Sequence, residues 1–284
     1  MYISMKNMLE KAKNENYAVM AINCFNLETA RSVITAAEKE NAPIIINLFQ
    51  DHLLYHCDSE LITPIVKTLA NRSKINVALN FDHGQEVIDL KKAIDDGFSS
   101  VMCDASRFGL EGNIAQTKEI VNYAHPKGVS VEGEIGCIGA VEGEQYTSDS
   151  MYTDPDEALK FVTQTGIDAL AISIGSSHGT YPDGMVPDFD FDRLKKIKSM
   201  INIPLVLHGG SGSGEKNILN CVKYGINKIN VGCDFMTANI NSIKSSLKKN
   251  PDITFFDIIE NCEKESIELV RYYIQLSGSS NKNL

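Results

Sequence analysis

Three of the six histidines share one local pattern: each follows a short apolar segment that predicts a strand, and each is followed directly by glycine. They are His83, His178 and His208. A glycine after a ligand lets the backbone turn sharply and leaves room for a bound group. Three converging neutral imidazoles make a catalytic type of zinc site with one open coordination position. The alternative is three unrelated histidines that only satisfy hydrogen bonds within the fold.

Three carboxylates accompany these histidines. Asp82 directly precedes His83 and could act as a general acid/base beside a metal, or could orient a ligand histidine. Neighbouring side chains of a strand point to opposite sides, so Asp82 and His83 share a site only if this alternation relaxes. Asp104 and Glu134 also end apolar segments and could hold a second cation or a mobile zinc ion. The alternatives are a helix N-cap at Asp104 and an ordinary loop charge at Glu134.

Two glycine-containing turns could bind an anion. Residues 209–212 read Gly-Gly-Ser-Gly and lie between a short apolar run and a helical pattern that begins near Glu215. Such a turn points several backbone N–H groups at one place. Residues 230–233 read Asn-Val-Gly-Cys and lie before another helical pattern. By contrast, His52 and His56 have no partner that completes a metal site, so a solvated helix face is expected for them.

These residues are placed by an alternation of short apolar runs and amphipathic segments. The predicted strands are 18–23, 43–48, 76–81, 100–103, 129–131, 169–174, 205–207 and 228–231. The predicted helices are 27–41, 61–71, 85–96, 112–125, 155–165, 190–200, 215–224 and 234–248. Eight strands with eight following helices favour an α/β fold of the (β/α)8 TIM barrel type. A doubly wound open sheet is the alternative, but no G-x-G-x-x-G fingerprint follows the first strand.

In a barrel the carboxyl ends of the strands meet on one face, where barrel enzymes carry their chemistry. The two glycine-containing turns then follow strands seven and eight, where barrels often bind phosphate. One further helical segment, 254–276, carries an apolar stripe that could cover the barrel or join a partner subunit. We see no linker, so residues 1–284 are expected to form a single domain.

Composition limits the possible partners. The 284 residues carry a net charge of −10 and a pI near 5.1, which makes a nucleic-acid surface unexpected. The same charge repels a phosphorylated ligand, so phosphate affinity must come from local N–H groups and one or two cations. The seven cysteines form no C-x-x-C pair, which is typical of reduced thiols in a cytoplasmic protein. No apolar stretch reaches the length of a membrane span, so no membrane contact is expected.

Together these motifs resemble the class II ketose-bisphosphate aldolases, the zinc-dependent fructose/tagatose-bisphosphate aldolase family. The most specific segments are Asn-Phe-Asp-His-Gly at 80–84, Gly-Ser-Ser-His-Gly at 175–179 and Leu-His-Gly-Gly-Ser-Gly at 207–212. The resemblance extends over nearly the whole chain.

The resemblance implies a role for each site residue. His83, His178 and His208 match the zinc ligands, and Asp82 matches the catalytic acid/base. Asp104 and Glu134 match carboxylates that hold a second divalent ion in some members. The residues that match the binding site of the dihydroxyacetone-phosphate half are Gly179, Gly209, Gly210, Ser211, Asn230, Val231, Gly232 and Cys233. A monovalent cation, Na+ or K+, and a homodimer or homotetramer are also implied.

The implied reaction is reversible aldol cleavage of a ketose 1,6-bisphosphate. Fructose 1,6-bisphosphate is the first candidate, and it would yield dihydroxyacetone phosphate and glyceraldehyde 3-phosphate. Tagatose 1,6-bisphosphate, or a related class II reaction with another aldehyde, is the alternative. A metal-dependent barrel hydrolase leaves the paired turns unexplained, and a non-catalytic metal- or sugar-phosphate-binding barrel leaves Asp82 unexplained.

Four positions depart from the family pattern. Phe49 stands where a serine usually helps to hold the aldehyde half, and Cys233 stands where a threonine or serine usually offers a hydroxyl to phosphate. Arg107 replaces a common histidine and Ala105 a common glycine. Phe49 removes a hydrogen-bond donor and adds bulk, which can reject a substrate. We therefore hypothesise that the preferred aldehyde is not glyceraldehyde 3-phosphate.

Overall fold

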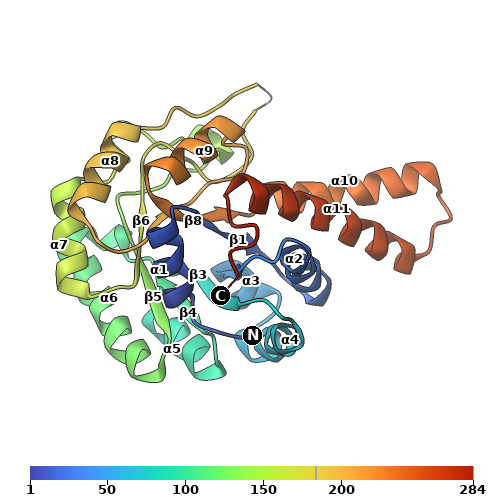
Figure 1. Ribbon diagram of the computed structural model, residues 1–284, viewed down its shortest axis with the longest axis horizontal. Helices are drawn as coiled ribbons and strands as arrows, with labels where there is room; N and C mark the ends of the chain where they lie inside the picture. The colour runs from blue at the N-terminus through green and yellow to red at the C-terminus, as the bar shows by residue number, and fades with distance from the viewer. Residues whose placement is uncertain (183, 284) are drawn as a thin grey trace.

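Eight parallel strands close into one barrel, and each strand pairs with its neighbours in sequence order (Figure 1). The computed structural model describes residues 1–182 and 184–283. The strands are β1 (Val19–Asn23), β2 (Ile44–Phe49), β3 (Val77–Gly84), β4 (Ser100–Cys103), β5 (Ser130–Ile135), β6 (Ala169–Ile172), β7 (Leu205–Leu207) and β8 (Ile226–Val231). Because β1 pairs with both β2 and β8, the predicted TIM barrel is confirmed and the open-sheet alternative is wrong.

Helices surround this barrel. They are α1 (Met5–Glu15), α2 (Leu27–Lys39), α3 (Gln50–Tyr55), α4 (Ser59–Arg72), α5 (Val87–Asp96), α6 (Gly109–Ala124), α7 (Pro155–Thr165), α8 (Phe191–Met200), α9 (Glu215–Tyr224), α10 (Cys233–Lys249) and α11 (Phe255–Leu276). Short 3-10 turns lie at Ser106–Phe108, His125–Lys127, Glu142–Glu144 and Asp149–Met151. None of the helices in the described chain combines the length and apolar composition needed to cross a membrane.

The barrel interior is apolar at the end where the strands begin. Val19 and Ala21 of β1, with the equivalent positions of other strands, form one buried cluster with α1. Met5, Met8, Leu9 and Ala12 of α1 are the buried residues that close this end. The sequence does not lead us to predict α1, although its buried residues have the i, i+3, i+4, i+7 spacing of an amphipathic helix.

Toward the other end of the barrel the inward positions become polar. Side chains that point inward recur every second residue of a strand. In β3, Ala78 belongs to the inner apolar cluster, and two residues further stands Asn80, followed by Asp82. In β7, Val206 is followed in the same way by His208. The carboxyl-terminal end of the barrel therefore collects the polar side chains of several strands.

Several strand boundaries differ from those predicted, and three strand ends matter for the site. β3 continues to Gly84 and β5 to Ile135, so Asp82, His83 and Glu134 lie within strands and not after them. β6 ends at Ile172, so His178 lies in the loop that follows it. Polar residues inside β3 and β5 interrupt the apolar runs, which explains why these strands seem shorter from the sequence.

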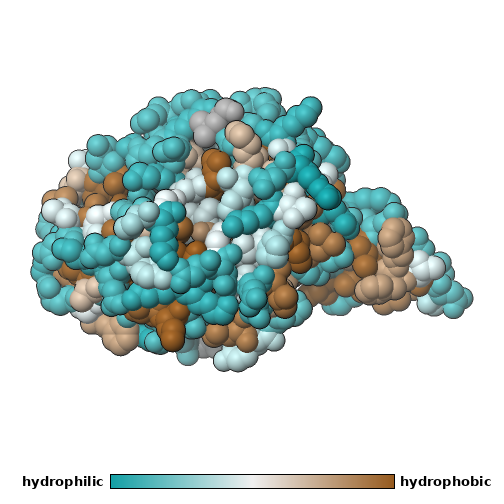
Figure 2. Space-filling view, turned by 90° about the horizontal axis from the view of Figure 1, so that it is seen from below, coloured by the Kyte–Doolittle hydropathy of each residue, from teal (hydrophilic) through white to brown (hydrophobic). Residues whose placement is uncertain are grey.

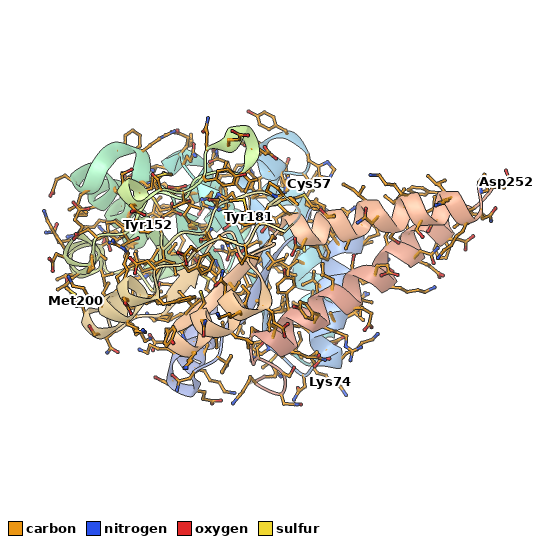
Figure 3. All side chains as sticks on the ribbon, turned by 90° about the horizontal axis from the view of Figure 1, so that it is seen from above. Cys57, Lys74, Tyr152, Tyr181, Met200 and Asp252 are labelled. Carbon is orange, nitrogen blue, oxygen red and sulfur yellow. The ribbon has the colours of Figure 1, made fainter. Side chains whose placement is uncertain are left out.

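α10 and α11 form a helical arm that projects from the barrel, with Asp252 at its tip (Figures 1 and 3). α11 packs against α10 and α2, and Val270 and Ile274 near its C-terminal end are buried. The C-terminal helix thus covers the barrel side at α2. Ile243, Leu247, Phe255 and Phe256 of the arm are exposed, and apolar residues are visible along it in Figure 2.

Gly133 tests how tightly the barrel is packed around the polar face. A Cβ at this position would lie 2.7 Å from Cε1 of Phe161, whose side chain is fully buried. We expect Gly133→Ala to lower the free energy of unfolding by about 1–3 kcal/mol, because overpacking forces backbone or side-chain shifts. Urea denaturation measures this change. A change in the free energy of unfolding within about 0.5 kcal/mol would show that β5 and α7 can shift enough to accommodate the added methyl group.

Candidate active site

A cavity of about 270 Å³ opens at the carboxyl ends of the strands. Its wall contains residues of six strands or of the segments that follow them. They are Asn23, Phe49, His52, Asp82, His83, His178, Gly179, His208, Gly209, Ser211, Asn230, Gly232, Cys233 and Met236. The cavity therefore brings together the three histidines, Asp82 and both glycine-containing turns.

The three histidine rings converge within this cavity. The ring centroid of His83 lies 4.9 Å from that of His178 and 4.6 Å from that of His208, and the last two are 5.9 Å apart. One ligand atom from each ring lies within 4.8 Å of the other two. Three imidazoles at such spacing fit a single metal ion with an open position.

His83 reaches this cluster through an unusual backbone conformation. Its φ is +53°, in the left-handed region that non-glycine residues seldom adopt. The pairing of β3 with β4 also shifts register between Phe81 and Gly84. These irregularities break the strict alternation of the strand, and as a result both Asp82 and His83 line the cavity. Such strain costs about 1–2 kcal/mol and is typical of functional sites.

His178 is held by a neighbouring loop. Its backbone N–H donates to the carbonyl oxygen of Gly139 at 2.7 Å, and its carbonyl oxygen accepts from the N–H of Val141 at 2.7 Å. This short bridge ties the loop after β6 to the loop after β5. The loop after β6 is thereby fixed where its histidine meets the other two.

The protonation states of the histidines also suit a metal ion. Burial, and then the neighbouring His83, hold the pKa values of His178 and His208 well below the ordinary 6.5. Both rings are therefore neutral at pH 7, the form that coordinates metals. For His83 burial opposes the charged form, but its hydrogen bond to Asp104 and nearby carboxylates raise its pKa to about 9.

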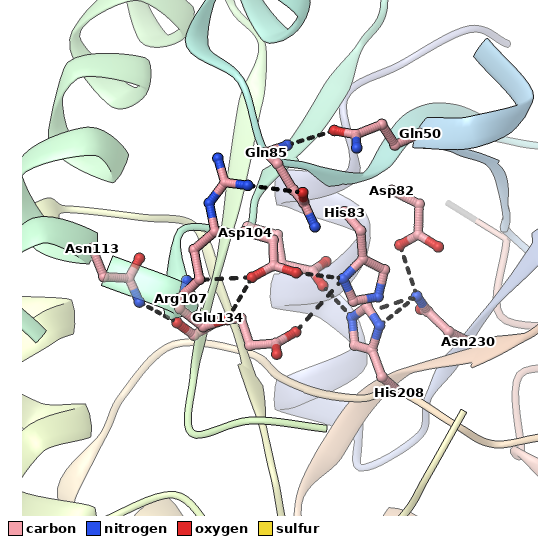
Figure 4. A network of polar contacts seen from close by, with 12 residues as sticks. Gln50, Asp82, His83, Gln85, Asp104, Arg107, Asn113, Glu134, His208 and Asn230 are labelled. Atoms are coloured by element: carbon pink, nitrogen blue, oxygen red, sulfur yellow. Dashed lines mark hydrogen bonds and ion pairs between the residues drawn. The ribbon is translucent and has the colours of Figure 1, made fainter. Parts of the chain in front are cut away.

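His83 still offers a ring nitrogen to a metal. Its Nδ1 lies 2.9 Å from Oδ2 of Asp104, while its buried Nε2 has no hydrogen-bond partner among the described residues (Figure 4). An unpaired buried nitrogen is costly unless something binds it. A metal ion would take the place of the proton on this ring.

Asp104 and Glu134 form a second candidate cation position with His83. One ligand atom from each of the three lies within 4.8 Å of the others. Burial and the nearby Asp104 raise the pKa of Glu134 to about 8. Its Oε2 is buried without a hydrogen-bond partner in the described chain. For Asp104, burial raises the pKa, but the hydrogen bond with His83, the charge of His83 and the hydrogen bonds from Ser106 together outweigh burial and lower the pKa.

Asp82 is placed beside the histidines by Asn230. The Nδ2 of Asn230 donates to Oδ1 of Asp82 at 3.0 Å, and it lies 3.3 Å from Nδ1 of His208 (Figure 4). Only 3% of Asp82 is exposed. A carboxylate held in this way next to three imidazoles can exchange a proton with a bound substrate.

The two glycine-containing turns meet at Ser211. Its Oγ accepts from the backbone N–H groups of Gly232 and Asp234, each at 3.2 Å. Gly209 has φ +66°, and a Cβ there would lie 2.5 Å from the carbonyl oxygen of Ser177. The first turn of α10 begins at Cys233, so this side of the cavity has the N–H groups of a helix N-terminus.

The predicted substrate-binding residues divide into two groups. Gly179, Gly209, Ser211, Asn230, Gly232 and Cys233 line the cavity. Gly210 and Val231 stand behind its wall: the N–H of Gly210 donates to the carbonyl oxygen of Asn230, and Val231 is fully buried. Their part in binding remains a prediction.

The expectation of a solvated helix face at His52 is wrong. His52 lies in the first turn of α3, which begins directly after β2, and its ring lines the cavity. Its centroid lies 4.8 Å from that of Phe25 and 5.9 Å from that of Phe49. His56, one turn further, is exposed as expected. A helix face was expected here, but not that the helix starts directly after β2, so the direction of His52 was not predictable.

A buried ion pair between Lys228 and Glu132 adjoins the ring of His208. Lys228 and Glu132 are both fully buried, and Nζ of Lys228 lies 2.7 Å from Oε2 of Glu132. The other carboxylate oxygen lies 2.9 Å from Nε2 of His208. A carboxylate on the far nitrogen of a ligand histidine fixes the ring orientation and tautomer. Lys228 stands two residues before Asn230, and this spacing was the available signal for its inward direction.

Comparisons with known proteins agree with this site. Residues 3–282 match the family described as Fructose-bisphosphate aldolase class-II. A fructose-bisphosphate aldolase of Staphylococcus aureus is 38% identical over 99% of this chain and 98% of its own. A 6-phospho-5-dehydro-2-deoxy-D-gluconate aldolase of Halalkalibacterium halodurans is 39% identical over 93% of this chain and 92% of its own.

A solved structure agrees as well. The crystal structure of the YdjI aldolase from Escherichia coli K12 superposes with a TM-score of 0.86 at 31% identity, and covers 100% of both chains. The chain therefore belongs to the class II fructose-bisphosphate aldolase family. It is an aldolase, an enzyme of the lyase class, as the resemblance implied.

Glu132 offers a test of the support beneath the metal site. We expect Glu132→Gln to weaken zinc affinity by about 10–100-fold, because the amide orients His208 less firmly than the carboxylate does. Competition with a chromogenic chelator measures this affinity, and thermal unfolding verifies that the variant is folded. Glu119→Gln, an exposed glutamate bound to Lys91, is the matched control. Equal zinc affinity in both variants would contradict this role.

Proposed function

We propose that the protein catalyses zinc-dependent, reversible aldol cleavage of a ketose phosphate to dihydroxyacetone phosphate and an aldehyde. The convergence of His83, His178 and His208 beside Asp82 carries this proposal. Fructose 1,6-bisphosphate is the first substrate to test, since the Staphylococcus aureus relative is named for it. Tagatose 1,6-bisphosphate follows, and the relative named for another substrate shows that the choice of sugar differs among similar chains.

Three imidazoles favour zinc at this site. Their donor nitrogens, two of them on rings that burial keeps neutral, match the nitrogen ligands of catalytic zinc. When bound, zinc polarises the ketose carbonyl as a Lewis acid and stabilises negative charge that develops there. His83, His178 and His208 would hold the ion at the wall of the cavity.

Asp82 is the proposed acid/base. It would take the proton from the C4 hydroxyl as the bond between C3 and C4 breaks, and would return it in the condensing direction. The hydrogen bond from Asn230 keeps one oxygen of Asp82 in place. The other oxygen then remains for the substrate hydroxyl.

The glycine-containing turns would bind the phosphate of the dihydroxyacetone-phosphate half. Ser211 ties the two turns together, and the N-terminus of α10 adds the favourable end of its dipole. A second divalent ion at Asp104 and Glu134, a Na+ or K+ ion near the phosphate, and a homodimer or homotetramer remain predictions. A cytoplasmic location also remains a prediction.

Asp82→Asn separates catalysis from binding. We expect kcat for cleavage to fall by about 10²–10⁴-fold, because an amide cannot accept the hydroxyl proton. Zinc content, measured by atomic emission on the purified variant, should match that of the wild type. Asp252→Asn at the exposed tip of the arm is the matched control and should keep full activity.

Two outcomes would contradict the role of Asp82. A variant with wild-type kcat would show that another group exchanges the proton. A variant that loses its zinc would show that Asp82 supports the metal site. The second result would revive the alternative role of Asp82 as a group that orients a ligand histidine.

A further inference from the structure

The two halves of the cavity differ in charge. On one side the turns after β7 and β8 line the cavity together with the N-terminus of α10, and a helix N-terminus suits one phosphate. On the side of β2 and β3, Phe49 is the register partner of Asp82 on the neighbouring strand. Since the proposed function places the C4 hydroxyl at Asp82, Phe49 would contact the half of the substrate that becomes the aldehyde.

This second half is lined without a cationic side chain. Among the described residues, the wall of the whole cavity includes neither lysine nor arginine. Arg107, at the edge of the polar network, binds the side chains of Gln85 and Glu86 and does not line the cavity (Figure 4). Burial, and then the nearby His56, lower the pKa of His52 below its ordinary 6.5, so this imidazole is uncharged at pH 7.

A second phosphate would therefore bind weakly in the aldehyde half of the cavity. It would meet the ring of Phe49 and the carboxylate of Asp82, and the net charge of −10 adds long-range repulsion. An anion taken from water into such surroundings loses its hydration without gaining a counter-charge. By contrast, the carbon chain of a sugar can pack on Phe49, and Asn23 and His52 can hydrogen-bond to its hydroxyls.

We propose that the preferred substrate carries a single phosphate, on the dihydroxyacetone side, and that the aldehyde released is an uncharged hydroxyaldehyde. This inference rests on the proposed function and departs from the prediction of a 1,6-bisphosphate. The reaction balances without a co-reactant. The C3–C4 bond breaks with its electron pair left on C3, the C4 hydroxyl loses its proton and becomes the aldehyde carbonyl, and C3 gains a proton.

Two substrates that differ only in the second phosphate test the inference. We would compare fructose 1-phosphate with fructose 1,6-bisphosphate, and the corresponding tagatose pair, by measuring dihydroxyacetone phosphate released by the zinc-loaded enzyme. We expect kcat/KM to be at least about tenfold higher for the monophosphate of the preferred sugar. A higher value for the bisphosphate would overturn this inference and leave the proposed function intact. No cleavage of any of the four sugars would count against both.

A substitution in the aldehyde half allows the missing charge to be added. His52 serves better than Met236, which lies in α10 near the proposed site of the first phosphate. His52 lies in α3 beside Phe49 and lines the cavity, so His52→Arg would place a cation in the aldehyde half, while His52→Gln is a neutral control. We expect the arginine to shift the ratio of kcat/KM values toward the bisphosphate by at least about tenfold, and the glutamine by less than about threefold. Equal shifts in both variants would show that charge does not exclude the second phosphate.

Phe49→Ser tests the apolar wall separately. This change removes the ring and restores a hydroxyl next to Asp82, so the relative use of different aldehydes in condensation should change. Unchanged relative use would show that Phe49 does not contact the aldehyde half. The metal content of each variant is measured in parallel, because the ring of Phe49 also lies 5.9 Å from that of His83.

Discussion

The ion pair between Lys228 and Glu132 is the constraint on which the rest of the site depends. Both side chains are fully buried, and β8 and β5 are not neighbours in the barrel, so the pair crosses its interior. Removing either partner would leave an uncompensated charge, which typically costs about 3–5 kcal/mol. The pair therefore holds two strands in a defined relation, and through Glu132 it also fixes His208. The same ion pair therefore stabilises the barrel and orients a histidine of the candidate metal site.

Above this pair, each polar residue restrains the next. Asn230 holds Asp82 and contacts the ring of His208, while Asp104 turns the ring of His83. The strained backbone of His83 persists because these contacts and the barrel walls determine its position. Several buried polar atoms in and around this network have no hydrogen-bond partner among the described residues. Two of them, Nε2 of His83 and Oε2 of Glu134, lie where a cation would bind.

Much of this arrangement could be predicted from the sequence. The alternation of strands and helices indicated the barrel, and the three His-Gly pairs indicated the centre of its polar face. Other features depended on contacts that no local pattern records. The direction of His52 follows from a six-residue helix, and the shared cavity of Asp82 and His83 follows from one positive φ angle. The two-residue spacing of Lys228 and Asn230 and the helical spacing of the apolar residues in α1 were present in the sequence. Polar residues between them made both patterns easy to miss.

In the proposed reaction the three histidines hold a metal on which carbon–carbon cleavage depends. We would measure the release of dihydroxyacetone phosphate by the enzyme as purified, after chelation, and after zinc is restored. We expect chelation to abolish the release and zinc to recover it. Cleavage that continues at the original rate in protein shown to be free of metal would contradict this role of the histidines.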